Sequence, residues 1–190
     1  MQVLKQRILA DGEVKEGNIL KVDSFLNHQI DPVLYEQMAE EFAVLFKDSG
    51  ANKIATIEAS GIGLACFVGH KMGLKVLFAK KNRTKNIAGN VYKASVKSYT
   101  SGQTYEIFVS KRFLDEDDRV LIIDDFLARG QAVLGLMNLC EQAGAEVVGC
   151  GIAIEKGFQD GGRLISDRGI KLCSLAVVES MRENEIVFRD

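Results

Sequence analysis

Apolar residues recur along this chain at two spacings, one typical of helices and the other of strands. Short apolar runs rich in β-branched residues, such as 120–123, indicate strands that are buried on both faces. Near the N-terminus, Val3, Leu4, Ile8 and Leu9 have helical spacing and predict a short amphipathic helix. The same reasoning predicts helices over 32–47, 61–72 and 131–143, and strands over 53–57, 75–79, 119–123, 146–154 and 170–179.

Residues that favour helix ends fit these boundaries. Asp31 and Pro32 suit the N-cap and the first position of a helix. Gly73 and Gly144 each suit the position just after a helix, where glycine adopts a left-handed conformation without strain. The ends of three helices are therefore predicted from single residues.

The order of the elements predicts the class of fold. Strands alternate with helices, which is typical of an α/β protein with a mostly parallel sheet flanked by helices on both faces. Residues 91–99 and 104–110 alternate in polarity around a Thr-Ser-Gly-Gln turn and predict one hairpin. Residues 82–90 are polar and lack periodicity, so we expect them to be mobile. No linker or repeat is evident, and we expect a single domain over 1–190.

Composition narrows the class of protein. The 190 residues are 47% apolar and 26% charged, and the net charge of −2 argues against a nucleic-acid surface. No apolar run approaches the roughly 20 residues of a membrane helix, and the N-terminus lacks the apolar core of a signal peptide. The cysteines form no CxxC motif, and Cys66, Cys140 and Cys150 lie in apolar runs. Buried free thiols and a cytoplasmic location are expected.

The segment 120–144 carries the strongest indication of chemistry. Asp124 and Asp125 follow the predicted strand, and the turn at 128–131 opens the next helix. Ligands of open α/β sheets bind beyond the carboxyl ends of the strands, and amides at a helix N-terminus attract anions. Main-chain amides could bind a phosphate, and the neighbouring carboxylates could bind vicinal hydroxyl groups. This combination suits a phosphorylated sugar. The alternative is an ordinary strand–loop–helix unit whose acids cap the helix. Neither GxxxxGK[ST] nor a suitably placed GxGxxG is present.

These residues resemble the ribose-phosphate signature of the type I phosphoribosyltransferases. Residues 58–62 (Glu-Ala-Ser-Gly-Ile) resemble the pyrophosphate loop of the purine members, and 80–85 (Lys-Lys-Asn-Arg-Thr-Lys) resemble the basic start of their flexible loop. The likeness extends through 18–32 and 155–162, and over this length the chain is similar to the bacterial xanthine phosphoribosyltransferases. One departure is Arg129, which stands where many relatives carry Thr.

The resemblance implies a type I phosphoribosyltransferase fold with a hairpin flexible loop and a small N-terminal hood drawn largely from 1–35. It also implies transfer of ribose phosphate from 5-phosphoribosyl 1-pyrophosphate (PRPP) to a purine. Asp124 and Asp125 are then expected to bind the ribose hydroxyls and to support a cationic sugar. The pyrophosphate is expected over Ser60 and Gly61. The 5′-phosphate is expected on the main-chain amides of Ala128, Arg129, Gly130, Gln131 and Ala132.

The remaining site residues are expected from their positions and from the same resemblance. Among the cations of 80–85, Lys81 is the candidate to face the leaving pyrophosphate, although charge runs are commonly solvated surface. Mg²⁺ is expected to arrive with the pyrophosphate rather than at a dedicated protein site. Lys156 is expected to donate to a purine 6-oxo group, with a plain surface lysine as the alternative. Leu20 and Asn27 are expected to contact the base from the hood.

Three hypotheses about function follow. The first is an enzyme of purine salvage, active as a homodimer, that converts xanthine and PRPP to xanthosine 5′-monophosphate and pyrophosphate, or a close variant that prefers guanine or hypoxanthine. The second is a regulator that binds PRPP without catalysis, for which the chain has no evident basic DNA-binding module. The third is an α/β nucleotide-binding protein of other chemistry, which the adjacent Asp pair disfavours.

Overall fold

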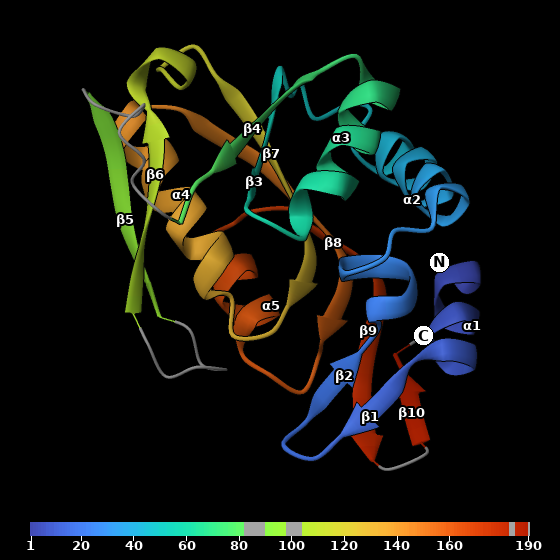
Figure 1. Ribbon diagram of the computed structural model, residues 1–190. Coiled ribbons are helices and arrows are strands. Elements are labelled where there is room, and N and C mark those ends of the chain that lie inside the picture. The colour runs from blue at the N-terminus through green and yellow to red at the C-terminus, as the bar shows by residue number, and fades with distance from the viewer. Residues whose placement is uncertain (82–89, 98–103, 183–184, 190) are drawn as a thin grey trace.

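The fold is built on a central sheet, seen in a computed structural model that describes residues 1–81, 90–97, 104–182 and 185–189. The strands of this sheet are β3 (Lys53–Ile57), β4 (Lys75–Ala79), β7 (Arg119–Leu127), β8 (Glu146–Lys156), β9 (Leu172–Arg182) and β10 (Glu185–Phe188). Within the described residues they are arranged in the order β10-β9-β8-β7-β3-β4 (Figure 1). The strands run parallel except β10, which lies antiparallel to β9 at one edge. The predicted mostly parallel sheet is confirmed.

Helices and two small hairpins cover both faces of the sheet (Figure 1). One apolar cluster joins α1, α2, α3 and the N-terminal hairpin to one face, and a second joins α4, α5 and the β5–β6 hairpin to the other. The helical elements are α1 (Gln2–Asp11), the π-helix η1 (Asp23–Asn27), α2 (Pro32–Leu45), α3 (Gly61–Met72), the 3₁₀ helix η3 (Lys111–Phe113), α4 (Gln131–Ala143) and α5 (Gly161–Ser166). The hairpins pair β1 (Glu13–Lys15) with β2 (Ile19–Lys21), and β5 (Val91–Lys97) with β6 (Thr104–Ser110).

Strand β7 shows why the apolar runs form central strands. Leu121 and Ile123 pack with α2 and α3, whereas Val120 and Ile122 pack with α4 on the opposite face. All four side chains are completely buried. A strand with helices on both sides needs apolar residues in both directions, which an uninterrupted apolar run supplies.

The helix ends follow the residues that predicted them. The Asp31 carboxylate accepts hydrogen bonds from the amides of Val33 and Leu34, at 3.1 and 3.2 Å, and thereby caps α2. Gly73 and Gly144 end α3 and α4 with φ angles of +69° and +75°. Each glycine takes the left-handed conformation that stops a helix.

Strand β7 is longer than its sequence predicted, which corrects the position of the two acids. It continues through Asp124 and Asp125 to Leu127 instead of ending at Ile123. Its pairing with β3 ends at Ala55 and Ile122, while its pairing with β8 continues to Leu127. The main chain of the acids is therefore held by β8 on one side only. Aspartate disfavours strands, but pairing with a long neighbour outweighs that weak preference.

Short elements and one cysteine also differ from the expectations. Four elements were not predicted from the sequence, namely β1, β2, β10 and α5, and each has six residues or fewer. Cys66 is exposed on α3, whereas Cys140 and Cys150 are buried free thiols as expected. In the predicted N-terminal helix, Leu4 and Ile8 face the core, but Val3 and Leu9 are 46% and 57% exposed. The buried face of α1 is therefore narrower than four apolar residues suggested.

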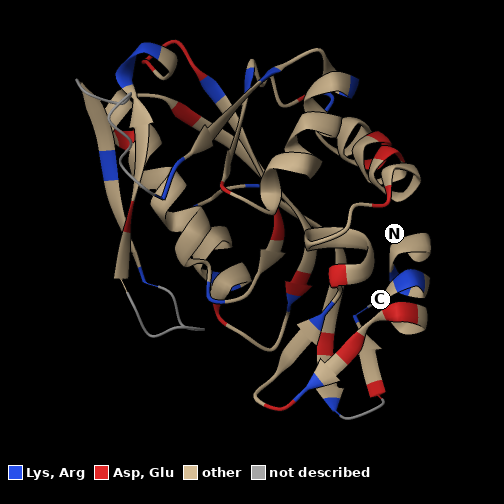
Figure 2. Cartoon of the chain, in the orientation of Figure 1, with Lys and Arg blue, Asp and Glu red and all other residues tan. Residues whose placement is uncertain are grey.

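Charged residues of both signs are interspersed along the ribbon (Figure 2). In the part of the chain that the structure describes, no helix is long and apolar enough to cross a membrane. The polar segment predicted to be mobile falls mostly within 82–89, and the turn of the predicted hairpin falls within 98–103. Both lie outside the described residues.

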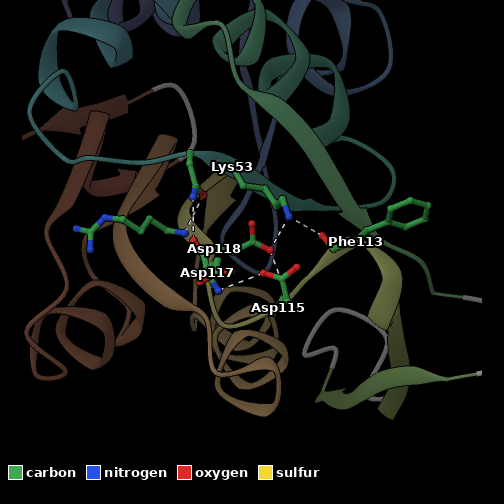
Figure 3. A network of polar contacts seen from close by, with 7 residues as sticks. Lys53, Phe113, Asp115, Asp117 and Asp118 are labelled. Atoms are coloured by element: carbon green, nitrogen blue, oxygen red, sulfur yellow. Dashed lines mark hydrogen bonds and ion pairs between the residues drawn. The ribbon is translucent and has the colours of Figure 1, made fainter.

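A polar network fixes the amino ends of β3 and β7 (Figure 3). The Lys53 ammonium donates to the Asp118 carboxylate at 2.5 Å and to the Phe113 carbonyl at 2.7 Å. The Asp118 carboxylate also accepts from the Asp115 amide at 3.0 Å, and the Asp115 carboxylate accepts from the Asp117 amide at 3.1 Å. The network thus joins the two strands at their amino ends. Toward their carboxyl ends the two strands are no longer paired.

Candidate functional site

Residues 128–132, which we call the phosphate loop, connect β7 to α4. Gly130 is the N-cap of α4 with a φ angle of +74°, and its carbonyl accepts from the Leu134 amide at 2.8 Å. Helix α4 begins at Gln131, so the amides of Gln131 and Ala132 belong to the first turn, whose donors have no partner within the helix. This end of the helix has the local geometry of an anion site.

Asp124 and Asp125, the acidic pair, lie on β7 just before the phosphate loop and are nearly buried, with exposed fractions of 4% and 5%. The Asp125 amide donates to the Asp124 carboxylate at 3.0 Å. Burial raises the pKa of Asp124 well above its ordinary value of 3.8, and the neighbouring charge of Asp125 raises this pKa further. The fold therefore holds a carboxyl group where its charge is costly, which is common at functional sites.

The predicted pyrophosphate loop lies against the acidic pair. Ser60 is the N-cap of α3, without a capping bond from its side chain, and the peptide bond between Glu58 and Ala59 is cis. A Cβ atom on Gly61 would lie 2.3 Å from Thr56 Oγ1 and 2.6 Å from Asp124 Oδ1. The start of α3 thus approaches β7 closely, and only glycine fits there.

Lys81 follows the carboxyl end of β4, at the same end of the strands as the acidic pair. Its amide donates to the Glu58 carboxylate, which joins it to the pyrophosphate loop. Its side-chain nitrogen lies 5.3 Å from the centre of the Tyr105 ring. The pKa of Tyr105 is raised by burial and by the charge of Asp124. Lys81, Tyr105 and Asp124 are therefore neighbours, although they come from three different strands or strand ends.

A cleft of about 670 Å³ opens beside these groups. It is lined by the whole phosphate loop and by three residues that the sequence reading assigned to the base, Leu20, Asn27 and Lys156. Tyr105 also lines it and connects it to the acidic pair. The volume is that of a site for a small organic ligand. Predicted phosphate and base contacts thus face one cleft.

The three base candidates reach the cleft from different elements. Leu20 is on β2 and 6% exposed, and Asn27 is the last residue of η1. Lys156 ends β8, and its ammonium donates to the Asn18 carbonyl at 2.8 Å. Burial lowers the pKa of Lys156. Lys156 is thus joined to the turn between β1 and β2 and is not a free surface lysine.

Other residues of the site were not predicted from the sequence. Tyr105 belongs to the alternating pattern of a hairpin, and Gln159 lies in a short loop, so neither has a local signal of function. Thr56 is completely buried, and its hydroxyl has no hydrogen-bond partner within the described residues. Phe126 supplies an aromatic ring to the lining of the cleft, and Phe158 is not among its lining residues.

The residues described contain no cluster of three His, Cys, Asp or Glu side chains that could hold a metal ion by themselves. The acidic pair supplies two adjacent carboxylates. Mg²⁺ is commonly bound by one or two carboxylates together with water and substrate phosphates. The donor set therefore fits an ion that is shared with a phosphorylated ligand.

Comparisons with known proteins agree with this geometry. Residues 37–174 match the model of the phosphoribosyl transferase domain. The chain is 52% identical to a xanthine phosphoribosyltransferase of Bacillus cereus over 188 residues, which is 99% of this chain and 95% of that protein. It is 53% identical over 188 residues to the xanthine phosphoribosyltransferase of Ligilactobacillus salivarius, covering 99% and 98% of the two chains.

Solved structures support the fold. Adenine phosphoribosyltransferase from Rhodothermus marinus superposes with a TM-score of 0.76 at 20% identity and covers 94% of this chain and 100% of that chain. The enzyme from Giardia lamblia complexed with 9-deazaadenine gives 0.73 at 24% identity, covering 88% and 90%. The expected type I fold is confirmed. The chain belongs to the phosphoribosyltransferase family, a group of enzymes of the glycosyltransferase type.

Proposed function

We propose that this protein is a purine salvage enzyme that converts xanthine and PRPP to xanthosine 5′-monophosphate and pyrophosphate. A ring nitrogen of xanthine forms a bond to the anomeric carbon of the sugar while the bond from that carbon to pyrophosphate breaks. The base loses the proton of that nitrogen to water or to the released pyrophosphate. The reaction needs two aligned substrates and a stabilised leaving group, and it needs no nucleophile from the protein.

The observation that carries the proposal is the single cleft shared by the phosphate loop, Leu20, Asn27 and Lys156. In this proposal the loop anchors the phosphate, and the other three residues contact the purine in the same cleft. The acidic pair precedes the anchor on β7 and suits the sugar between them. The relatives at 52% and 53% identity carry the name xanthine phosphoribosyltransferase, which supports xanthine as the base.

In this proposal each group acts at one part of the substrates. The amides of the phosphate loop bind the 5′-phosphate, and Arg129 adds positive charge. Asp124 and Asp125 accept hydrogen bonds from the ribose hydroxyls and stabilise positive charge that develops on the sugar. The start of α3, with Ser60 and Gly61, binds the pyrophosphate.

Mg²⁺ and Lys81 complete the proposed leaving-group site. Mg²⁺ would be held by the pyrophosphate, water and the acidic pair, and it supplies charge neutralisation of the leaving group when bound. Lys81 is joined to the pyrophosphate loop through Glu58 and can approach the same charge.

Base selection is proposed to depend on Lys156 and the hood. An ammonium group only donates hydrogen bonds, so it suits a 6-oxo purine and disfavours the 6-amino group of adenine. A polar group left unpaired in a closed site costs about 1–3 kcal/mol. Asn27 can donate to the 2-oxo group of xanthine, and guanine carries an amino group at that position.

Parallel assays with xanthine, guanine, hypoxanthine and adenine test the proposal. We expect the highest kcat/KM with xanthine and the lowest with adenine. Asn27→Asp replaces a donor with an acceptor and should shift the xanthine-to-guanine ratio of kcat/KM toward guanine by about tenfold. Equal turnover of all four bases by the unmodified protein would contradict the base assignment. Absence of any PRPP-dependent product would contradict the enzymatic proposal itself.

We also propose that the enzyme works in the cytoplasm as a homodimer. The free thiols of Cys140 and Cys150 fit a reducing compartment. The exposed rings of Phe78 and Phe113, at 38% and 54%, lie by the β4 edge of the sheet and support an interface there.

A further inference from the structure

Helix α5 begins with two glycines, and the first of them touches the phosphate loop. The Gly161 amide donates to the Ala128 carbonyl at 3.0 Å. A Cβ atom on Gly161 would lie 2.4 Å from the Ala128 carbonyl oxygen and 2.8 Å from the Gly130 amide nitrogen. In return, a Cβ atom on Gly130 would lie 3.2 Å from the Gly161 Cα atom. The two backbones are therefore in direct contact, and the Leu127 side chain lies 3.0 Å from the same Cβ position on Gly161.

The second glycine faces a different neighbour. A Cβ atom on Gly162 would lie 2.2 Å from Glu155 Oε1. Glu155 is 8% exposed, and its other carboxylate oxygen accepts from the Ser174 hydroxyl at 2.5 Å. The first turn of α5 is thus confined between the Glu155 side chain and the phosphate loop, and Gly161 faces the loop.

The chain that leads to Gly161 starts at the proposed base contact. Lys156 is paired with Val178 in the sheet, and the Gly157 amide donates to the Val178 carbonyl at 2.8 Å. Gln159, between them and α5, lines the cleft. Residues 156–161 therefore run from a point fixed to β9 to the backbone of the phosphate loop. The segment joins Lys156 to the phosphate loop, and both line the cleft.

We propose that Gly161 is a positioning residue that sets the phosphate loop at the distance from Lys156 that the bound substrates require. The proposal rests on the function given above, because it assigns the phosphate loop to PRPP. Gly161 touches no substrate in this proposal. It acts by donating a hydrogen bond to the Ala128 carbonyl and by packing its backbone against Gly130, which fixes the position of the loop amides at the cleft.

The test is Gly161→Ala, with Gly162→Ala as the matched control. Each variant adds one methyl group to the first turn of α5. The first methyl meets loop backbone, which has to move by on the order of 1 Å to reach an ordinary contact distance, and displacements of that size cost up to about 10²-fold in activity. The second methyl meets the Glu155 carboxylate, which is buried and hydrogen-bonded to Ser174, so we expect this variant to be destabilised as well, but at a contact that does not involve the loop. Melting temperatures of both variants are measured to establish how much each is destabilised.

For Gly161→Ala we expect KM for PRPP and Kd for ribose 5-phosphate to rise by roughly tenfold or more, with KM for xanthine changed much less. For Gly162→Ala we expect KM for PRPP and Kd for ribose 5-phosphate to stay within about twofold of the values for the unmodified protein, although its melting temperature falls by a comparable amount. Unchanged constants in Gly161→Ala, or an equal rise in both variants, would overturn the proposal. Unmodified protein that binds neither ribose 5-phosphate nor PRPP would overturn the proposed function as well.

Hydrogen exchange of the unmodified protein gives a test that does not depend on the folding of a variant. On addition of ribose 5-phosphate, peptides covering 127–133 and 158–163 should gain protection together, because the Gly161 amide is bonded to the loop. Protection confined to 127–133 would overturn the positioning role while leaving the proposed function in place.

Discussion

At the scale of single residues, Asp124 shows most directly how the site departs from what stability favours. Its carboxyl group is 4% exposed beside another carboxyl group, and burial raises its pKa well above 3.8. A folded state that binds a proton more tightly than the unfolded state loses stability as the pH rises above the unfolded pKa. The loss of stability caused by the charged Asp124 carboxylate is therefore absent near pH 3.8 and below, and it grows toward neutral pH.

Asp124→Asn removes this charge and keeps the shape and the acceptor for the Asp125 amide. We expect its melting temperature at pH 8 to rise by roughly 2–4 °C, as for a gain of on the order of 1 kcal/mol, and the gain to shrink at about pH 5. We expect kcat/KM for PRPP to fall on the order of tenfold or more. Calorimetry at both pH values and steady-state kinetics measure these effects. A lower melting temperature of the variant at the higher pH would contradict the argument.

Tyr105 gives a second prediction about a single residue, because its ring lies under the Lys81 ammonium. A cation above an aromatic face gains about 0.5–1 kcal/mol at an exposed site. Tyr105→Leu removes the ring and should lower kcat/KM for PRPP about two- to fivefold, whereas Tyr105→Phe keeps the ring and should stay close to the unmodified protein. If both variants lose activity equally, the hydroxyl group and not the ring is the important part of Tyr105.

At the scale of elements, the site depends on how closely α3 approaches β7. Gly61 has Thr56 Oγ1 and Asp124 Oδ1 within 2.6 Å of the position of a Cβ atom. Both neighbours are buried, so neither can turn away into solvent. Gly61→Ala should therefore displace the start of α3 and lower kcat by on the order of tenfold or more.

A neighbouring glycine of the same helix provides the comparison. A Cβ atom on Gly63 would meet Ile30 at 2.8 Å and Tyr35 at 3.1 Å, away from the acidic pair. Gly63→Ala should lower the melting temperature, while its kcat remains much closer to that of the unmodified protein. Equal kcat values for Gly61→Ala and Gly63→Ala would show that the contact with Asp124 does not matter.

The elements also show what the sequence could and could not reveal. The helices and parallel strands were predictable because their apolar periodicity is long and their ends carry Asp31, Gly73 and Gly144. The end of β7 was not predictable. Aspartate disfavours strands, but pairing with β8 keeps Asp124 and Asp125 in the strand. Elements such as α5 and β10 are too short to show a period.

The site divides in the same way. The phosphate loop and the acidic pair lie within one continuous segment, so their proximity could be read from the sequence. Contacts between distant segments could not, among them Lys156 with Asn18 and Gly161 with Ala128. These contacts depend on the three-dimensional arrangement of β8, α5 and the N-terminal hairpin, for which no local pattern exists.

At the scale of the whole molecule, the two edges of the central sheet differ. Strand β10 is antiparallel to β9 and ends the sheet on one side. Strand β4 ends it on the other, and beyond β4 the chain makes one isolated bridge within the described residues, between Lys80 and Phe108. The Phe113 ring points away from the polar network at the amino ends of the strands (Figure 3). An open strand edge next to exposed aromatic rings is a common place for a subunit interface.

We therefore expect a homodimer in which the β4 side of each chain contacts its partner by two-fold symmetry. Light scattering should give about twice the chain mass of 20.9 kDa. Phe113→Glu places a charge on the proposed interface and should shift the mass toward that of one chain, because burying an unpaired carboxylate is costly. Val187→Glu serves as the control, since Val187 is 42% exposed on β10 at the opposite edge. A mass near 20.9 kDa for the unmodified protein would reject the dimer. Dissociation by Val187→Glu and not by Phe113→Glu would place the interface at the other edge.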